Sequence, residues 1–459
     1  MRRPVLRSVV CATALAGVSL SGVATSAAAQ DIAERDSLTL AQAVALAQQT
    51  YPGVASARAS EDAAAAALGE ARAAWWPQLS TQATAVRYEE PMLVAPIHGF
   101  SPQQFERIEL ERTLFQGNVS LAWTIFDGGA RVNRIRGARA GAAGAAAGRT
   151  AAEMALTARV AAAYLQALTA RGVLDAQERR IEALSAERRR VEQLLGEGRA
   201  APVQLLRVDA ALAEAEAEQV ATFTRLDLAE RDLARLLGVS PGVARVDKLR
   251  AVRLAAGAQI AERADLVERA KANNPELNRA LRVLEMAEAN RRVAKAAWIP
   301  SLNLRGALLG FSSEAGNTTT EWNVGIALAY PLFTGGARAN AVSRASAAAR
   351  AAREELRLTE LRTEEAVDRA LNAAFETRAL VEALTRAVSH QTEVVRIEQL
   401  SLEAGAGTQT DYLRAEADLA RARARLVEAR HAEIAARIEL ARVVGELRPD
   451  WLARNLENP

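Results

Sequence analysis

Two kinds of hydrophobic pattern alternate along the chain. In the longer kind, apolar residues recur every three or four positions, and neither residues 131–195 nor residues 338–403 contain proline. This spacing predicts two α-helices, each about 100 Å long. In the shorter kind, apolar and polar residues alternate, which is typical of β-strands with one apolar side. Strands are predicted at about residues 77–88, 117–127, 300–311 and 321–333.

A glycine-containing turn follows each long helix, and a shorter helix then returns along it. The turns contain Gly198 and Gly405, and the hairpins are predicted to span residues 131–237 and 338–444. Sustained 3–4 spacing over this length favours antiparallel coiled coils. Each returning helix, of about 54 Å, covers only part of its long partner. A second short helix before each strand pair, such as residues 54–75, is therefore predicted to lie end to end with it.

The chain contains the same unit twice. Trp76-Pro77 returns as Ile299-Pro300, and Phe126-Asp127-Gly128-Gly129-Ala130-Arg131 returns as Phe333-Thr334-Gly335-Gly336-Ala337-Arg338. The two offsets, 223 and 207 residues, show that the first copy carries 16 extra residues between Pro77 and Phe126. We predict two tandem repeats, residues 30–238 and 263–445, with a linker at 239–262 and a C-terminal tail at 446–459.

Composition indicates an exported protein made of closely packed helices. Half of the residues are hydrophobic, yet only 4% are aromatic. Residues 1–29 are predicted to be a signal peptide, because Arg2, Arg3 and Arg7 precede an apolar run and a small-residue cleavage site. Its removal takes away the formal net charge of +3 and the single cysteine, Cys11. The mature chain is thus expected to be nearly neutral, free of disulfides and without a basic nucleic-acid surface.

The strands are long enough to cross a membrane, whereas no apolar stretch after residue 29 is long enough for a spanning helix. Four strands cannot close, and open sheet edges are not viable in hydrocarbon. Three copies would give twelve strands, the smallest multiple with room for water. We therefore predict a 12-stranded trimeric β-barrel on a long antiparallel coiled-coil helical barrel. Aromatic residues at the strand ends would form interfacial girdles: Trp75, Trp76, Trp298 and Tyr330. A soluble sheet with one buried face shows the same alternation and stays open as an alternative.

Catalytic, cofactor and metal chemistry are not predicted. The three histidines, His98, His390 and His431, are too scattered to suggest a metal site. Gly196-Glu197-Gly198 lacks the third glycine and the preceding strand of a dinucleotide-binding loop. We therefore expect a protein that is not an enzyme and has no cofactor.

Together these segments resemble the TolC-type outer-membrane efflux proteins over essentially the whole mature chain. The matching features are Leu38-Thr39-Leu40-Ala41-Gln42-Ala43, Tyr51-Pro52 with Asn274-Pro275, Trp76-Pro77 with Ile299-Pro300, and the two Gly-Gly strand-to-helix corners. The resemblance implies a homotrimeric channel of a tripartite efflux or type I secretion system, in outer-membrane lipid and extending into the periplasm of a Gram-negative cell. It also implies a periplasmic adaptor and an inner-membrane pump of RND or ABC type as partners, with drugs, metals or other molecules as substrates.

The resemblance further implies an aperture at the periplasmic end. Gly198 and Gly405 would lie at helical tips that touch the adaptor, and Asp411 would occupy a position where some members carry a carboxylate ring. Arg414 takes the next ring position and Gln204 is the first-repeat equivalent of Asp411, so the ring would be sparse. A helix N-terminus alone also favours an acidic residue, and that alternative stays open. The 16 extra residues, within residues 87–112, are expected to form an extracellular loop.

A second class of function fits the helices without the strands. A soluble periplasmic coiled-coil scaffold or adaptor would need the long hairpins but not the strands flanked by tryptophan. Release of the mature protein by osmotic shock would favour this alternative.

Overall fold

The computed structural model describes residues 37–96, 110–240, 245–255, 259–314, 316 and 318–457. The predicted signal peptide and the central part of the expected extracellular loop lie outside these residues. The helices are α2 (Leu40–Thr50), α3 (Pro52–Ala73), α4 (Ala130–Gly196), α5 (Pro202–Leu237), α6 (Arg263–Asn273), α7 (Pro275–Ala296), α8 (Ala337–Glu403), α9 (Gln409–Val444) and α10 (Pro449–Asn455), with a 3₁₀ helix, η3, at Val246–Lys248. The strands are β1 (Gln78–Leu93), β2 (Leu110–Phe126), β3 (Arg253–Leu254), β4 (Ser301–Ser313), β5 (Thr318–Ala329) and β6 (Leu456–Glu457).

Capping residues and prolines determine where the short helices begin. The Thr39 hydroxyl accepts the Gln42 backbone N–H (3.3 Å), and the Gln42 side chain accepts the Thr39 N–H (2.9 Å), which forms a capping box at α2. Pro52 and Pro275 start α3 and α7, because a residue without an N–H loses nothing in the first helical turn. Each short helix is therefore separated from its predecessor by a single residue in an extended conformation.

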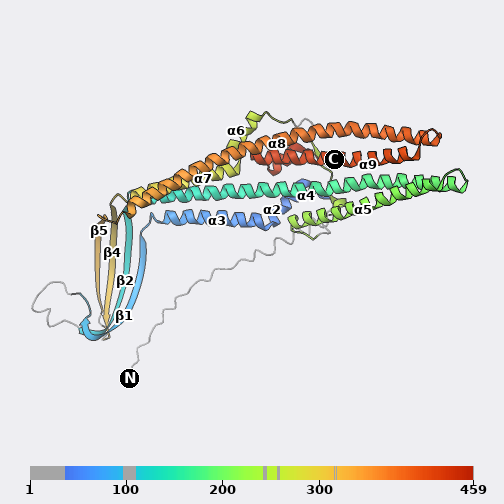
Figure 1. Cartoon of the computed structure of the whole chain (residues 1–459). Helices are drawn as coiled ribbons and strands as arrows, with labels where there is room; N and C mark the ends of the chain where they lie inside the picture. The colour runs from blue at the N-terminus through green and yellow to red at the C-terminus, as the bar shows by residue number, and fades with distance from the viewer. Residues whose placement is uncertain are drawn as a thin grey trace, which may run out of the picture.

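The helices lie side by side in a row (Figure 1). α3 and α5 pack on α4, which also contacts α7 and α9, and those two helices in turn pack on α8. Two short helices thus stand end to end beside each 67-residue helix, as the helix lengths predict. The predicted mainly helical fold with a duplicated strand–helix unit is confirmed. Within the part of the chain that the structure describes, no helix combines the length and the apolar character needed to cross a membrane.

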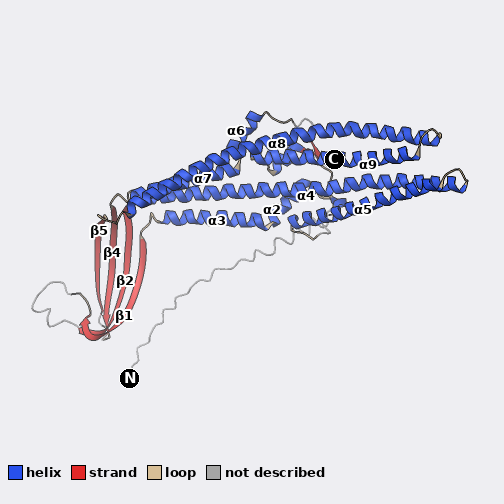
Figure 2. Ribbon diagram, in the orientation of Figure 1, coloured by secondary structure: helices blue, strands red, loops and turns tan. Residues whose placement is uncertain are grey.

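A four-stranded antiparallel sheet lies at one end of the helical row (Figure 2). Its order, β1-β2-β4-β5, repeats the order of α3, α4, α7 and α8, to which these strands are joined. On one face Leu304 lies opposite both Trp123 and Ile326, and the neighbouring positions are also mostly apolar. On the other face Ser80 lies opposite Ser120, with their hydroxyl oxygens 2.7 Å apart. The sheet therefore has one apolar and one polar face.

The strands differ from the predicted bounds at two places. β1 extends to Leu93 and β2 begins at Leu110, so part of the 16-residue excess lengthens this strand pair. A β-bulge between Arg87 and Met92 interrupts the pairing there, which explains why alternation alone missed the extension. β5 ends at Ala329 instead of residue 333, since Pro331 follows and has no N–H for the ladder.

The main apolar core lies along the helical row rather than in the sheet. It combines residues of α2, the central part of α4, the end of α5 and the C-terminal segment. Tyr164 of α4 is fully buried there, and its hydroxyl oxygen lies 2.8 Å from the carbonyl oxygen of Leu38 and 2.7 Å from that of Arg250. Trp451 packs against the same core. The connecting segments are thereby fixed to the helices at this level.

Candidate functional site

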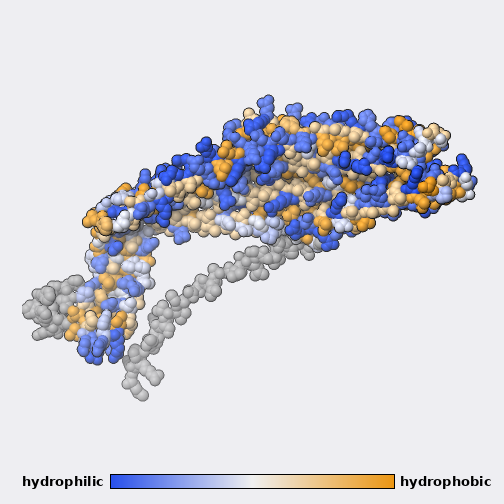
Figure 3. Space-filling model, viewed as in Figure 1, coloured by the Kyte–Doolittle hydropathy of each residue, from blue (hydrophilic) through white to orange (hydrophobic). Residues whose placement is uncertain are grey.

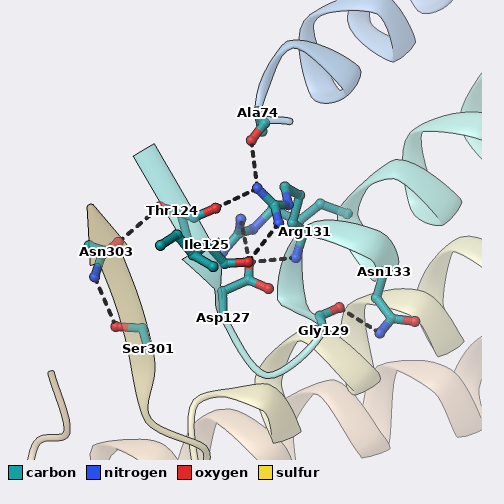
Figure 4. Close-up of polar contacts among 10 residues, drawn as sticks. Ala74, Thr124, Ile125, Asp127, Gly129, Arg131, Asn133, Ser301 and Asn303 are labelled. Atoms are coloured by element: carbon teal, nitrogen blue, oxygen red, sulfur yellow. Dashed lines mark hydrogen bonds and ion pairs between the residues drawn. The ribbon is translucent and has the colours of Figure 1, made fainter. Parts of the chain in front are cut away.

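Arg131 holds the corner where the first repeat passes from sheet to helix (Figure 4). Its guanidinium donates to the carbonyl oxygens of Ala74 at the end of α3 (3.1 Å) and of Thr124 (2.7 Å) and Ile125 (3.3 Å) on β2. It also stacks 3.9 Å from the centroid of the Trp75 ring. Arg131 is itself buried in the first turn of α4. Its side chain therefore joins α4 to the end of α3 and to β2.

The turn before Arg131 requires two glycines. Gly128 and Gly129 have φ angles of +63° and +83°, in the left-handed region that favours glycine. The Asp127 carboxylate accepts the backbone N–H of Arg131 at 2.7 Å and so caps the start of α4. A Cβ atom on Gly128 would lie 2.8 Å from the Cβ of Ile299. The corner of the first repeat is therefore packed tightly against the second repeat.

The second repeat builds the same corner more loosely. Arg338 donates to the carbonyl oxygens of Ala297 and Leu332, each at 3.4 Å. Its guanidinium lies 4.5 Å from the Trp298 ring centroid and 5.2 Å from that of Tyr330. The sequence reasoning missed the role of both arginines. Two features of the sequence could have indicated this role. Each copy of the Gly-Gly-Ala-Arg motif ends in an arginine, and a tryptophan, Trp75 or Trp298, follows the helix that precedes each strand pair.

The four predicted interface aromatics lie at this junction of sheet and helices. Trp75, Trp298 and Tyr330 stack against the corner arginines, whereas Trp76 is 74% exposed. The structure thus brings them to one level of the molecule. Their contact with lipid stays a prediction.

The two glycines predicted at the helical tips end the long helices, at the opposite end of the row from the sheet (Figure 1). Gly198 has φ +72° and Gly405 has φ +74°. In each turn the glycine N–H and the next N–H bond back to carbonyls of the last helical turn, as Arg199 does to Leu194 (2.8 Å) and Ala406 to Ser401 (2.8 Å). This is the Schellman geometry, which needs a left-handed residue after the helix. Both turns are exposed, so their backbone is accessible to a partner.

Asp411 lies in the first turn of α9, six residues after Gly405. Its backbone N–H donates to the Thr408 hydroxyl (3.2 Å), and that hydroxyl lies 2.6 Å from the Asp411 carboxylate. This geometry is that of a helix cap, the alternative interpretation left open by the sequence. The side chain is nevertheless exposed, so capping does not hide its charge.

Two hydrogen bonds near the tips connect the hairpin of the first repeat to that of the second. Arg207 of α5 donates to the Thr410 hydroxyl at 3.1 Å. The Gln409 side-chain amide donates to the Glu187 carboxylate of α4 at 3.2 Å, and both of these side chains are buried. Sequence reasoning missed these contacts, because nothing in a heptad pattern shows which polar residues face another hairpin. They hold the start of α9 against the first hairpin.

A half-buried acidic residue, Glu416, lies further along α9. The Tyr412 hydroxyl donates to the Glu416 carboxylate at 3.4 Å. Burial raises the pKa of the Glu416 carboxyl, and the hydrogen bond from Tyr412 opposes this shift. Burial, followed by the negative charges of Glu416 and Glu187, raises the pKa of the Tyr412 hydroxyl. The packed side of α9 around Tyr412 and Glu416 therefore disfavours additional negative charge.

Comparison with known proteins agrees with this arrangement of sheet, corners and tips. The model of the outer membrane efflux protein family matches residues 43–239 and 266–446, one match for each repeat. The chain belongs to the outer membrane efflux protein family. It is an outer-membrane channel of the kind that serves tripartite efflux or secretion systems.

Individual relatives cover most of the chain. Protein CyaE of Bordetella pertussis is 30% identical over 406 residues, which span 85% of this chain and 81% of the relative. Among solved structures, the Campylobacter jejuni CmeC outer membrane channel has a TM-score of 0.75 and 16% identity, covering 91% of this chain and 87% of its own. The Vibrio cholerae outer membrane protein VceC has a TM-score of 0.73 and 18% identity, covering 88% and 96%. At these identities the structural likeness establishes the fold.

Proposed function

We propose that three copies of this channel protein assemble side by side into a closed conduit. The free edges of the sheet and of the helical row coincide, because α3 and β1 form one edge of the chain while β5 and α8 form the other. A single rotation therefore joins sheet edge to sheet edge and helix edge to helix edge. Placing β5 beside β1 of the next copy also continues the antiparallel order around a twelve-stranded barrel.

The unpaired sheet edges support this assembly. In a single copy, β1 and β5 each have a neighbour on one side only. An unsatisfied backbone group in hydrocarbon costs several kcal/mol, so an edge strand of about ten residues is not viable there. Closure with neighbouring copies satisfies both edges at once. The apolar face then lies against outer-membrane lipid and the polar face lines the lumen.

Exposed apolar side chains on the two edge helices support the same arrangement. Patches of hydrophobic residues, coloured orange, are visible along the helical body in the space-filling view (Figure 3). On each edge helix the exposed apolar side chains fall on one side when 100° is allowed per residue. They are Val203, Leu206, Val220, Phe223 and Leu228 on α5, and Leu358, Leu361, Phe375, Leu380, Val394, Ile397 and Leu400 on α8. We infer that α8 of one copy packs against α3 and α5 of the next.

The helical tips would face the periplasm and bind the adaptor of an inner-membrane pump. The turns with Gly198 and Gly405 support this role, since they lie farthest from the sheet and are exposed. Three copies of Asp411 would add negative charge to the aperture that the tips surround. The hydrogen bonds from Arg207 and Gln409 across the hairpins would hold this aperture in its present arrangement. We expect that the protein is not an enzyme. The inner-membrane pump would determine which substrates are exported.

Electron microscopy of the purified protein in mild detergent tests this proposal. We expect particles with threefold symmetry, a short barrel and a tube of about 100 Å. Globular monomers would refute the conduit. Osmotic shock addresses the remaining alternative: the protein should stay with the outer membrane until detergent is added, whereas release by shock alone would favour a soluble scaffold.

A further inference from the structure

Arg305 carries a charge on the polar face of the sheet, near the end of the sheet that joins the helices. It lies on β4, where its cross-strand partners are Ala122 on β2 and Gly325 on β5. The residues two positions away along its own strand are Asn303 and Ala307. The Arg305 side chain is exposed, and it has no ion pair or hydrogen bond with any described residue.

The surroundings of Arg305 offer no compensating carboxylate. Within the described sheet, the next acidic side chain on this face is Glu321, which lies opposite Leu309 and thus about 13 Å further along the strands. The polar face of β1, which the next copy would contribute, carries uncharged residues at this level: Gln78, Ser80, Gln82 and Thr84. Assembly of three copies therefore leaves the positive charge unneutralised.

The apolar face of the sheet extends to the level of Arg305. The adjacent residue, Leu304, points to the other face of the sheet, where its cross-strand partners are Trp123 and Ile326. The outer face of the sheet is therefore apolar at this level. A charged side chain at this level is tolerated when it faces a water-filled interior. Small neighbours on both sides leave it room to extend into that interior: a Cβ atom added at Gly325 would meet no atom within 4 Å.

We propose that three copies of Arg305 form a ring of positive charge in the barrel lumen, so that this section of the conduit favours anions. The proposal rests on the trimeric barrel proposed above. With strands about 4.8 Å apart and tilted by about 40°, the backbone of twelve strands lies roughly 12 Å from the axis. An arginine side chain spans about half of that radius. The three guanidinium groups are then within about one Debye length of any ion on the axis.

The substrate class follows from this charge. Rings of arginine or lysine select anions in pores, and guanidinium binds carboxylate and phosphate oxygens in a bidentate manner. Solutes bearing a carboxylate, phosphate or sulfonate group would be concentrated in the barrel, and cations would be depleted. At about 6 Å in a water-like dielectric and 0.1 M salt, three charges change the local ratio of anions to cations by at least about tenfold.

Thiol reactivity inside the assembled protein tests the ring directly. The mature chain is predicted to lack cysteine, so an Ala307→Cys variant would carry one thiol beside Arg305. Its rates of reaction with an anionic sulfonate reagent and a cationic trimethylammonium reagent, both methanethiosulfonates, report the local potential as a ratio. We expect Arg305→Gln in this background to lower the ratio of anionic to cationic rates by about tenfold. Because the ratio is taken for one thiol, changes in thiol acidity cancel.

Two further variants make the result specific. Gly325→Glu places a carboxylate opposite Arg305 and should lower the ratio in the same direction while leaving the arginine in place. Arg87→Gln removes an equal charge from the other face of the sheet, where Arg87 pairs with Glu314 at 3.7 Å, and should leave the ratio unchanged.

The outcomes separate the ring from the conduit. A thiol at residue 307 that reacts with both reagents at a ratio insensitive to Arg305→Gln and Gly325→Glu would refute the anion-favouring ring and leave the barrel intact. A thiol that neither water-soluble reagent reaches would refute the lumenal position of this face, and with it both proposals.

Discussion

Replacing Arg131 with alanine tests whether one side chain holds the sheet against the helices. The change removes three hydrogen bonds from a charged donor and the stack on Trp75. Hydrogen bonds from charged groups contribute about 1.5–3 kcal/mol each, but water can reach the freed carbonyl oxygens at this corner. We therefore expect the free energy of local opening to fall by about 3 kcal/mol, which is about a hundredfold in the opening equilibrium.

Hydrogen exchange measured by mass spectrometry reads this opening directly. The reporting peptide should contain the amides of Ala130, Arg131 and Asn133, which bond to Asp127 or Gly129 across the turn. Their exchange should accelerate by about a hundredfold when opening limits exchange.

Arg338→Ala is the matched control for this experiment. Its hydrogen bonds are 3.4 Å long and the arginine is more exposed, so we expect a loss of only about 1 kcal/mol at the second corner. Equal acceleration at the two corners, or no change at either, would refute the reasoning.

Three further substitutions test other parts of the structure. Gly128→Ala should destabilise the protein by about 2 kcal/mol or more in thermal unfolding, because the new Cβ would meet Ile299 and the backbone has positive φ. His431, whose Nδ1 lies 2.7 Å from the Thr169 hydroxyl, has a pKa below 6.5 because of burial and then the nearby Arg430 charge. Its depressed pKa contributes stability that is present above pH 6.5 and lost as the pH falls through the folded-state value, so His431→Gln should reduce the loss of stability on acidification. Gln409→Ala should raise single-channel conductance in planar bilayers, since it removes a bond that holds α9 against α4.

Each of these has a control within the chain. Gly335→Ala has the same backbone conformation but no atom within 4 Å of the new Cβ, so it should cost less than Gly128→Ala. His390→Gln makes the same substitution at an exposed histidine and serves as the control for His431→Gln. Gln399→Ala removes an exposed amide that bonds within its own helix, and conductance should not change. A control that behaves like its test variant would contradict the corresponding explanation.

Periodicity predicted the fold because each element repeats one simple pattern many times. The alternation along β5, for example, is read directly from Trp322, Val324, Ile326 and Leu328, and the structure exposes all four on one face. The duplicated corner motif likewise located both sheet-to-helix turns. These features depend on local sequence alone, so no knowledge of neighbouring elements was needed.

The contacts that the sequence did not predict are between segments distant in the chain. Arg131 reaches a carbonyl 57 residues away, and Gln409 reaches a carboxylate 222 residues away. Backbone carbonyls carry no residue identity, so an arginine that binds them leaves no pair to recognise. The bulge after Arg87 was missed for a related reason, since a change of register depends on the partner strand.

Disulfide trapping between the two sheet edges tests the closed trimer most directly. Within one copy β1 and β5 are separated by two strands, or about 14 Å, which no disulfide can span. Thr81→Cys on β1, combined in turn with Val324→Cys, Ile326→Cys or Leu328→Cys on β5, can therefore react only between copies. We predict that oxidation of at least one pair in the membrane yields covalent dimers and trimers and nothing larger on non-reducing gels. Monomers for every pair, or a ladder that continues beyond three copies, would contradict the closed conduit.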